Sequence, residues 1–319
     1  MKLISEVYED LFNAMMSGLA HCRAIYDING KMIDWIFITV NLAFREQSGI
    51  KEDPTGKTVN ILIPTLYERN PELFERYERV ARSGKAERFE TYIAPLQKHF
   101  DVSVYSVQID TFTIIFDDIT EAKTQAHKLR TSNEATVMAF VSSLQTRDNE
   151  TQEHTIRVSE MAVQFGQRLA MNDAELQDVR RGALLHDIGK IGISDLILLK
   201  PSALTETEMD IMKKHPKLGY DLLTKLPFLR EASIIPYCHH EKWDGSGYPR
   251  GLIGEEIPFM ARMFAIVDVY DALTSDRPYR KAWPQKLALD HLEKESGKSF
   301  DPMMVLAFIE LVEAEMLGL

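Results

Sequence analysis

The residues best suited to chemistry centre on the stretch Leu-Leu-His-Asp-Ile-Gly-Lys at positions 184–190. His186, Asp187 and Lys190 fall within about one and a half helical turns, and their leucine and isoleucine neighbours are typical of a core. A buried carboxylate is costly unless it is paired with a cation or bound to a metal ion. The stretch therefore predicts an ion-paired or metal-binding site whose other ligands come from elsewhere in the chain.

Carboxylates and histidines recur in two helical patterns around this stretch. Glu150 and His154 are four residues apart and share one face of a predicted helix. Asp268 and Asp271 are three residues apart within an apolar helical segment, where a core aspartate needs a partner. Taken alone, the first pair is more typical of a charged helix surface.

Three more histidines follow predicted helical or apolar segments. His215 comes after a helix that begins with the capping box Thr-Glu-Thr-Glu at 205–208, and the doublet His239-His240 follows an apolar stretch. Each of these has an ordinary structural explanation. Five of the nine histidines, together with three carboxylates, in buried-looking helices are harder to explain as core residues, and they favour a metal cluster.

The combined pattern resembles the HD domain superfamily, and specifically its HD-GYP branch, over about residues 135–319. The matching residues are Glu150-Thr-x-x-His154, His186-Asp187-x-x-Lys190, His215, His239-His240, Gly245-x-Gly247-Tyr248-Pro249 and Asp268-x-x-Asp271-Ala-Leu-Thr-x-x-Arg277-x-x-Arg280. The resemblance implies an all-α bundle that hydrolyses cyclic dinucleotides, chiefly cyclic di-GMP to pGpG or on to GMP. Arg280 stands where a lysine is common in the family.

The resemblance also implies roles for these residues. One metal ion takes His154, His186, Asp187 and Asp268, with Asp187 bridging to a second ion held by His215, His239 and His240, and Glu150 is associated with a third. Asp187 and Lys190 are the catalytic candidates, and Lys190 contacts the phosphate. The further substrate-binding candidates are Tyr248, Asp271, Arg277 and Arg280, since a guanidinium fork suits phosphate oxygens. Solvated surface charge is the alternative explanation for the two arginines.

Phosphodiester hydrolysis needs a nucleophile at neutral pH and neutralisation of the phosphate charge. Two or three divalent ions can bridge a water, lower its pKa and clamp the phosphate. Mixed imidazole and carboxylate ligands suit iron, manganese or zinc rather than magnesium, and iron is the first choice. Two alternatives stay open: hydrolysis of 3′,3′-cyclic GMP-AMP, and a domain that binds a cyclic dinucleotide or a partner protein without turnover.

Composition restricts the remaining function classes. The 319 residues carry a formal net charge of -11, which argues against nonspecific binding to nucleic acid or to an anionic membrane. Only two cysteines occur, Cys22 and Cys238, so a disulfide framework is not expected and a reducing cytoplasm is the predicted location. No signal peptide or membrane-length apolar run is read from the sequence.

The N-terminal region alternates predicted strands and short helices. A helix at 5–18 is followed by strands at 21–26 and 32–40 around a hairpin turn at Asp27-Ile28-Asn29-Gly30, helices at 41–48 and 71–83, and strands at 88–94, 100–109 and 112–116. At Asp27-x-x-Gly30, Asn41-x-Ala-Phe and Asp118-Ile-Thr-Glu this region resembles a PAS domain, a sensory or dimerising module. Its ligand is unknown, and Cys22 on a strand disfavours the flavin-photoreceptor type.

Residues 119–146 lack glycine and proline and show apolar residues at helical spacing, which predicts one connecting helix. In a homodimer it would pair as a coiled coil; packing on its own domain is the alternative. The expected architecture is multidomain α+β: a PAS-like domain at 1–120, a signalling helix at 121–146 and an all-α HD-GYP domain at 147–319. The resemblance also suggests the loop at 244–249 as a docking surface for a diguanylate cyclase domain.

Overall fold

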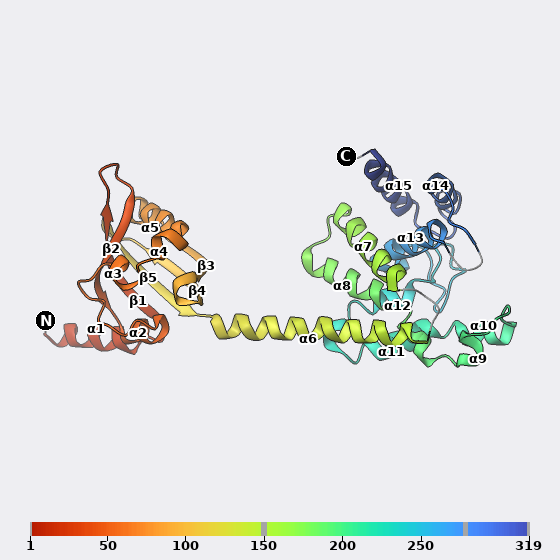
Figure 1. The fold of residues 1–319 in the computed structure, drawn as a ribbon, viewed down its shortest axis with the longest axis horizontal. Helices are drawn as coiled ribbons and strands as arrows, with labels where there is room; N and C mark the ends of the chain where they lie inside the picture. Colours follow the sequence, from red (N-terminus) through yellow and green to blue (C-terminus); the bar gives the residue numbers. More distant parts are fainter. Residues whose placement is uncertain (1, 148–151, 277–279, 318–319) are drawn as a thin grey trace. The chain divides into compact units, whose positions relative to one another are not determined.

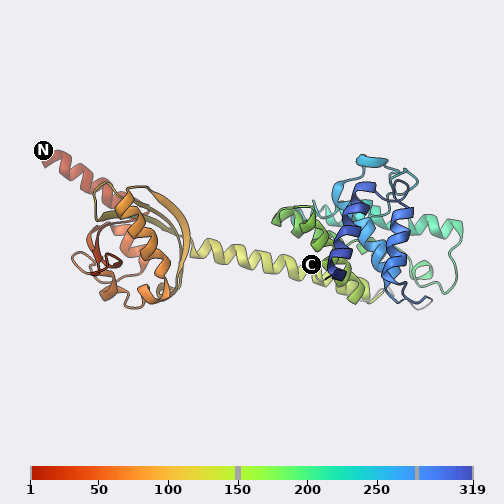
Figure 2. The ribbon, with the colours of Figure 1, turned by 90° about the horizontal axis from the view of Figure 1, so that it is seen from above.

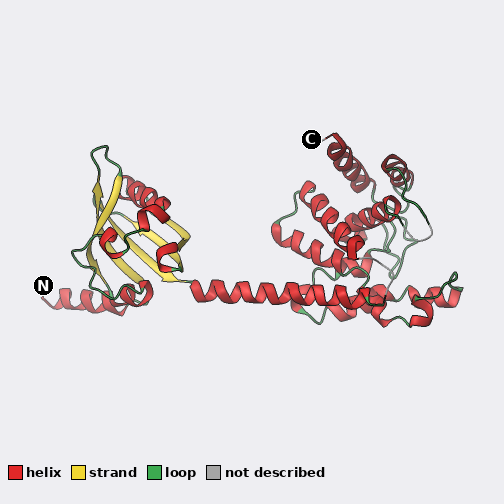
Figure 3. Cartoon of the chain, viewed as in Figure 1, coloured by secondary structure: helices red, strands yellow, loops and turns green. Residues whose placement is uncertain are grey.

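The computed structural model describes residues 2–147, 152–276 and 280–317. Residue contacts divide the chain into two compact units, Met1–Arg130 and Thr131–Leu319. The five strands all lie in the first unit, and the second is built of helices, as Figure 3 shows. The predicted combination of an N-terminal sheet domain and a C-terminal all-helical domain is confirmed.

The first unit contains one fully antiparallel sheet with the strand order β2-β1-β5-β4-β3. Its strands are β1 (Gly18–Tyr26), β2 (Met32–Val40), β3 (Glu87–Ile93), β4 (Lys98–Tyr105) and β5 (Thr111–Asp118). The strand predicted at 100–109 ends earlier, at Tyr105, because a turn that reaches Asp110 at a φ of 63° follows it.

The hairpin between β1 and β2 forms where the sequence predicts it. The Asp27 carboxylate accepts the backbone N–H groups of Asn29 and Lys31, at 2.9 and 2.8 Å. Gly30 takes the left-handed conformation with a φ of 79°, a region that glycine enters without a steric cost. The glycine therefore provides the positive φ of this turn.

The helices after β2 cover the sheet of the first unit, and Figure 2 shows the strands curving around them, whereas the N-terminal helix extends away from the sheet. The helices are α1 (Lys2–Ala14), α2 (Leu42–Ser48), α3 (Val59–Leu62), α4 (Leu66–Arg69) and α5 (Pro71–Ser83). Trp35 of β2, Phe74 of α5 and Phe112 of β5 are in ring contact within the core. An apolar cavity of about 70 Å³ lies beside them.

The predicted connecting helix is one element, α6 (Thr120–Gln145), labelled in Figure 1. Its buried residues are Val137 and Val141, which belong to a core cluster with Leu185, Ile188 and Leu223 of the second unit. The C-terminal half of α6 is therefore part of the helical unit.

The second unit is all-helical over its described residues. Its α-helices are α7 (Gln152–Arg168), α8 (Asp173–Leu184), α9 (Asp195–Leu198), α10 (Glu206–Met212), α11 (His215–Leu223), α12 (Ile234–Cys238), α13 (Phe259–Thr274), α14 (Gln285–Lys294) and α15 (Pro302–Leu317). A 3₁₀ helix, η2 (Ile188–Gly192), follows α8. Phe165, Phe264 and Phe308 are fully buried in the main core. No helix among the described residues combines the length and apolar character needed to cross a bilayer.

Candidate metal centre

The central histidine and aspartate sit where α8 ends and η2 begins. Leu185 caps α8 and Asp187 precedes η2, so the backbone changes direction at these residues and their side chains enter the interior. Gly189 lies against the start of α11: a Cβ atom there would stand 1.8 Å from the carbonyl oxygen of His215. The absence of a side chain at 189 lets α11 approach η2 closely enough to bring His215 to Asp187.

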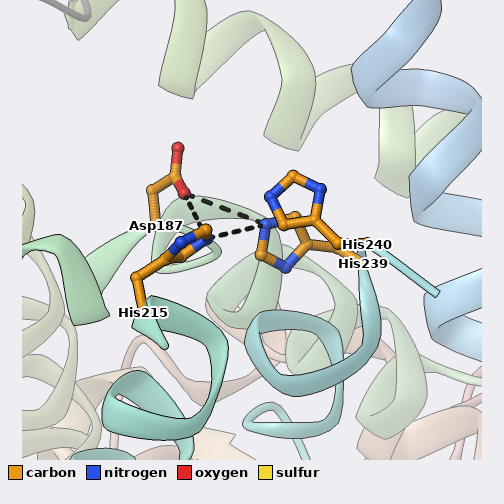
Figure 4. A group of neighbouring side chains, drawn as sticks. All are labelled: Asp187, His215, His239 and His240. Carbon is orange, nitrogen blue, oxygen red and sulfur yellow. Dashed lines mark hydrogen bonds and ion pairs between the residues drawn. The ribbon is translucent and has the colours of Figure 1, made fainter. Parts of the chain in front are cut away.

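One group of possible metal ligands consists of Asp187, His215, His239 and His240, shown in Figure 4. Asp187 Oδ1 lies 3.1 Å from His215 Nε2 and 3.8 Å from His239 Nε2. The Nε2 atoms of His215 and His239 are 3.5 Å apart. The turn between α8 and η2, the start of α11 and the residues that follow α12 therefore converge on one point.

A second group consists of His154, His186 and Asp268. They come from α7, the end of α8 and α13, and His154 Nε2 lies 3.9 Å from Asp268 Oδ1. Asp187 connects the two groups, because its Oδ2 lies 3.2 Å from His186 Nε2 while its Oδ1 faces the first group. All seven residues named in the sequence for these two positions are thus brought together.

The imidazoles are oriented by hydrogen bonds on their outer nitrogens. Nδ1 of His186 donates to the carbonyl of Ala183 at 2.8 Å, and Nδ1 of His215 donates to that of Met212 at 2.9 Å. His239 Nδ1 donates to the carbonyl of Pro236 at 3.0 Å. In a neutral ring this leaves Nε2 with a lone pair directed into the cluster, which is how metal-ligating histidines are usually held.

These orientations bring hydrogen-bond acceptors together. In the neutral rings, His215 Nε2 and His239 Nε2 are both acceptors, and so is the carboxylate oxygen between them. Asp187 Oδ1 is buried, and no residue that the structure describes is positioned to donate a hydrogen bond to it, despite its short distance to His215. A buried set of mutually facing acceptors needs a cation, so the donor set fits divalent metal ions, and its nitrogen and oxygen atoms fit iron, manganese or zinc.

Electrostatics favour the protonation states that a metal needs. Burial alone would raise the pKa of Asp187, but Lys190 and His186 outweigh it and hold that pKa well below its ordinary value. Burial, reinforced by His240, lowers the pKa of His239 far below its usual range. Burial and His215 lower the pKa of His240 to about 3. These groups are therefore an ionised carboxylate and neutral imidazoles near pH 7.

Lys190 and Tyr248 lie at the mouth of this cluster, as the sequence analysis expects. Lys190 Nζ is 2.7 Å from Asp187 Oδ2, and the Tyr248 ring stacks on His240 with centroids 4.7 Å apart. Burial raises the pKa of Tyr248 to about 12, so its hydroxyl stays protonated. Both residues line a pocket of about 390 Å³ above the ligand groups.

Asp271 occupies a different place from the one its predicted substrate contact requires. Its side chain is 1% exposed and accepts hydrogen bonds from His154 Nδ1, at 2.6 Å, and from Arg157. Burial raises its pKa, yet these two donors lower it to about 2. Asp271 therefore lies behind His154 and orients that ring, in the same way that backbone carbonyls orient His186 and His215.

Of the remaining predicted contacts, the structure describes only Arg280. Arg280 is exposed, donates to the Ala272 carbonyl and lies over the Trp283 ring, 5.4 Å from its centroid. Arg280 is not among the residues lining the pocket. Glu150 and Arg277 lie outside the described residues.

Two residues that hold parts of the site in place are not predicted from the sequence. Arg157 lies one helical turn after His154 on α7 and holds Asp271. Glu241 follows the histidine doublet, is buried, and accepts the N–H groups of Arg250 and Leu252 at 2.7 and 3.0 Å. The i,i+3 spacing could have pointed to Arg157; nothing in the sequence shows that Glu241 holds the backbone of the loop carrying Tyr248.

Known proteins resemble the helical unit and the connector. A model of the HD domain matches residues 117–304. The chain is 43% identical over 176 residues to the cyclic di-GMP phosphodiesterase response regulator RpfG of Xanthomonas campestris, covering 54% of this chain and 47% of that protein. It is 43% identical to a cyclic di-GMP phosphodiesterase of Thermotoga maritima, covering 52% and 45%.

A third relative has a different substrate in its name. The chain is 39% identical over 169 residues to the 3′3′-cGAMP-specific phosphodiesterase 3 of Vibrio cholerae, covering 53% of this chain and 37% of the relative. The chain thus spans about half the length, or less, of the curated relatives it matches. Because the HD domain model covers more than half of the sequence, this chain belongs to the HD domain family.

Proposed function

We propose that the protein is a metal-dependent phosphodiesterase of the HD-GYP type that hydrolyses cyclic di-GMP to pGpG, GMP or both. One observation carries this proposal: the Nε2 atoms of His215 and His239 face each other at 3.5 Å, with Asp187 Oδ1 3.1 Å from the first and 3.8 Å from the second. Relatives at 43% identity carry the name cyclic di-GMP phosphodiesterase, which supports the substrate class.

The ligand groups define the metal positions in this proposal. Two ions would sit with His154, His186 and Asp268 and with His215, His239 and His240, and Asp187 would bridge them; Glu150 would serve a third. Iron is our first choice, with manganese or zinc as alternatives. When bound, such ions would supply Lewis-acid activation of water and neutralise phosphate charge.

The protein's own groups bind and orient the substrate. Neutral imidazoles add no charge, and the three carboxylates of the ligand set would not cancel the charge of the bound divalent ions. The resulting net positive charge would favour an anionic phosphodiester. Lys190, held 2.7 Å from Asp187 at the pocket wall, would contact a non-bridging phosphate oxygen. Tyr248, fixed against His240, would close the side of the pocket, and Arg277 and Arg280 would reach a substrate from outside it.

A second candidate substrate is 3′,3′-cyclic GMP-AMP, because a relative at 39% identity is named for it. A non-catalytic role is less well supported, since each described ligand position carries a metal-binding residue. The two substrates share the phosphodiester and differ in one base, so the metal groups act on both alike.

The first unit would act as a PAS-like sensor, and the protein would form a homodimer through that unit and α6. Its order of two strands, short helices and three strands in one sheet supports this assignment, and its apolar cavity could take a small ligand. Light scattering tests the dimer; a monomer at all concentrations would contradict it.

The loop at 244–249 would offer a docking surface for a diguanylate cyclase domain.

The decisive experiment compares wild-type protein with Asp187→Asn, each loaded anaerobically with iron, manganese or zinc. We expect wild-type protein to hydrolyse cyclic di-GMP and the variant to lose activity by more than about 100-fold, beyond the effect of losing an outer-shell partner. Asp195→Asn, at an exposed ion pair with Arg147, is the matched control. Turnover by Asp187→Asn at the wild-type rate, or a fully metal-loaded wild type inert toward both cyclic dinucleotides, would overturn the proposal.

A further inference from the structure

A second pocket of about 370 Å³ adjoins the pocket above the metal ligands. The two pockets share His239, His240, Tyr248, Asp268 and Val269. If the proposed function holds, the scissile phosphate lies at the ligand groups between them. The nucleosides on either side of that phosphate must then extend away from it, and the second pocket is the space open to one of them.

The second pocket combines an apolar surface with a fixed carboxylate. Ala265, Val269 and Phe300 line it together with Glu295 and Ser299. The Ser299 hydroxyl donates to Glu295 Oε2 at 2.8 Å, whereas Oε1 makes no hydrogen bond with any residue that the structure describes. The hydrogen bond from Ser299 lowers the pKa of Glu295, so this side chain is an ionised acceptor.

The wall that carries Glu295 is held by backbone hydrogen bonds, some of which connect it to the loop of Tyr248. The Glu295 carbonyl accepts the N–H groups of Lys298 and Ser299, at 3.1 and 2.9 Å, which fixes the turn after α14. Trp243 and Asp244 donate their backbone N–H groups to carbonyls of that turn at 3.2 and 2.9 Å. A base bound here would therefore meet an acceptor that is already in position.

We propose that the second pocket binds one guanine base of the cyclic dinucleotide and that Glu295 accepts hydrogen bonds from its N1–H and N2–H groups. An ionised carboxylate only accepts hydrogen bonds, and guanine presents two adjacent donors on its Watson–Crick edge. Adenine presents an acceptor at N1, which would face the carboxylate unpaired. A site that hydrogen-bonds the N–H groups of one ligand discriminates against a ligand that lacks them.

The test measures binding of GMP and AMP to the metal-loaded full chain by calorimetry. We expect wild-type protein to prefer GMP by about 10- to 100-fold, the range for a hydrogen bond to a charged group, and Glu295→Gln to lose most of that preference. Glu293→Gln, exposed on the same helix, should keep it. Ser299→Ala, which frees the carboxylate without changing its charge, should lose part of it. If Glu295→Gln does not fold, a weaker preference for GMP in Ser299→Ala than in wild type would support the proposal. An unchanged preference in Ser299→Ala would contradict it.

The outcomes separate this proposal from the proposed function on which it rests. Hydrolysis of cyclic di-GMP without a preference for GMP, or with a preference that Glu295→Gln leaves unchanged, would overturn the guanine pocket and leave the phosphodiesterase intact. A preference for GMP that depends on Glu295, in a protein inert toward cyclic dinucleotides, would support the pocket and overturn the phosphodiesterase.

Discussion

His154 Nδ1 lies 2.6 Å from Oδ2 of Asp271, a carboxylate that Arg157 also holds. The outer nitrogen of His154 is thus held by a charged side chain, whereas those of His186, His215 and His239 donate to backbone carbonyls. A carboxylate partner makes the ring a stronger electron donor, and a side-chain partner can be changed by mutation.

Asp271→Asn should weaken metal binding at the group of His154, His186 and Asp268. An asparagine can offer its NH₂ group to Nδ1, which would move the ring proton to Nε2 and remove the lone pair facing Asp268. Losing such an outer partner typically costs about 10- to 100-fold in metal affinity. Metal titration against a competing chelator measures it, with Asp290→Asn on the exposed side of α14 as the control. Equal metal affinity in wild type and Asp271→Asn would contradict the positioning role.

Gly189→Ala should separate His215 from Asp187. The added Cβ would collide with backbone atoms of α11, and relieving it requires η2 and α11 to move apart. Overpacking of this kind costs about 1–3 kcal/mol of stability, and a misplacement near 1 Å at a catalytic centre can cost about 100-fold in rate.

Gly192→Ala provides the control for this substitution, because its Cβ would meet only the Cδ1 end of Leu218, at 2.9 Å. Thermal melts and metal stoichiometry of the two variants compare them directly. A Gly189→Ala protein with wild-type metal content and activity would show that the close approach is not required.

The sequence predicts the ligand set through its resemblance to the HD-GYP branch, because each histidine or aspartate taken alone has an ordinary structural explanation and only their combination indicates a metal cluster. It also predicts most elements, since glycine and asparagine mark their ends: Asn41 caps α2 through Phe44 N–H, and Gly49 ends it at a φ of 75°. The spacing of apolar residues does not determine which group a polar side chain contacts. The resemblance assigns Asp271 to the substrate, whereas in the structure it contacts His154 and Arg157 of α7.

Contacts between distant backbone segments are the part that the sequence does not reveal. In the sequence, Gly189 is one glycine of a motif. Only the structure shows that a Cβ atom at this position would collide with the carbonyl oxygen of His215. Glu241 reads as a surface charge after the histidine doublet, yet it is 3% exposed and accepts two backbone N–H groups. Both roles depend on which loop folds against which helix, and that is set by tertiary packing.

Glu241→Gln should loosen the loop that carries Tyr248. Glutamine keeps one acceptor but places an NH₂ donor against the N–H group of Arg250 or Leu252, so one buried donor loses its partner, at a cost of about 1–3 kcal/mol. Tyr248 would then lose its fixed position against His240. We expect lower thermal stability and a higher KM with unchanged metal content, measured against Glu255→Gln as an exposed control. Wild-type stability and KM would contradict the role of Glu241.

Metal-free protein should lose stability as the pH falls below about 6.5. Because the pKa of His240 is about 3 in the folded state, against an ordinary value of 6.5, the unfolded chain binds more protons throughout that window. Stability rises with pH wherever the unfolded state binds more protons, so this contribution is fully present above pH 6.5 and declines toward pH 3. Bound metal should raise the melting temperature at pH 7, since it binds the folded state.

Melting temperatures of chelator-treated protein between pH 7 and pH 4 measure this dependence. His240→Gln removes the group that titrates, so its melting temperature should fall less steeply with acid than that of wild type. Equal slopes for His240→Gln and wild type would mean that the buried imidazole contributes nothing to the acid sensitivity.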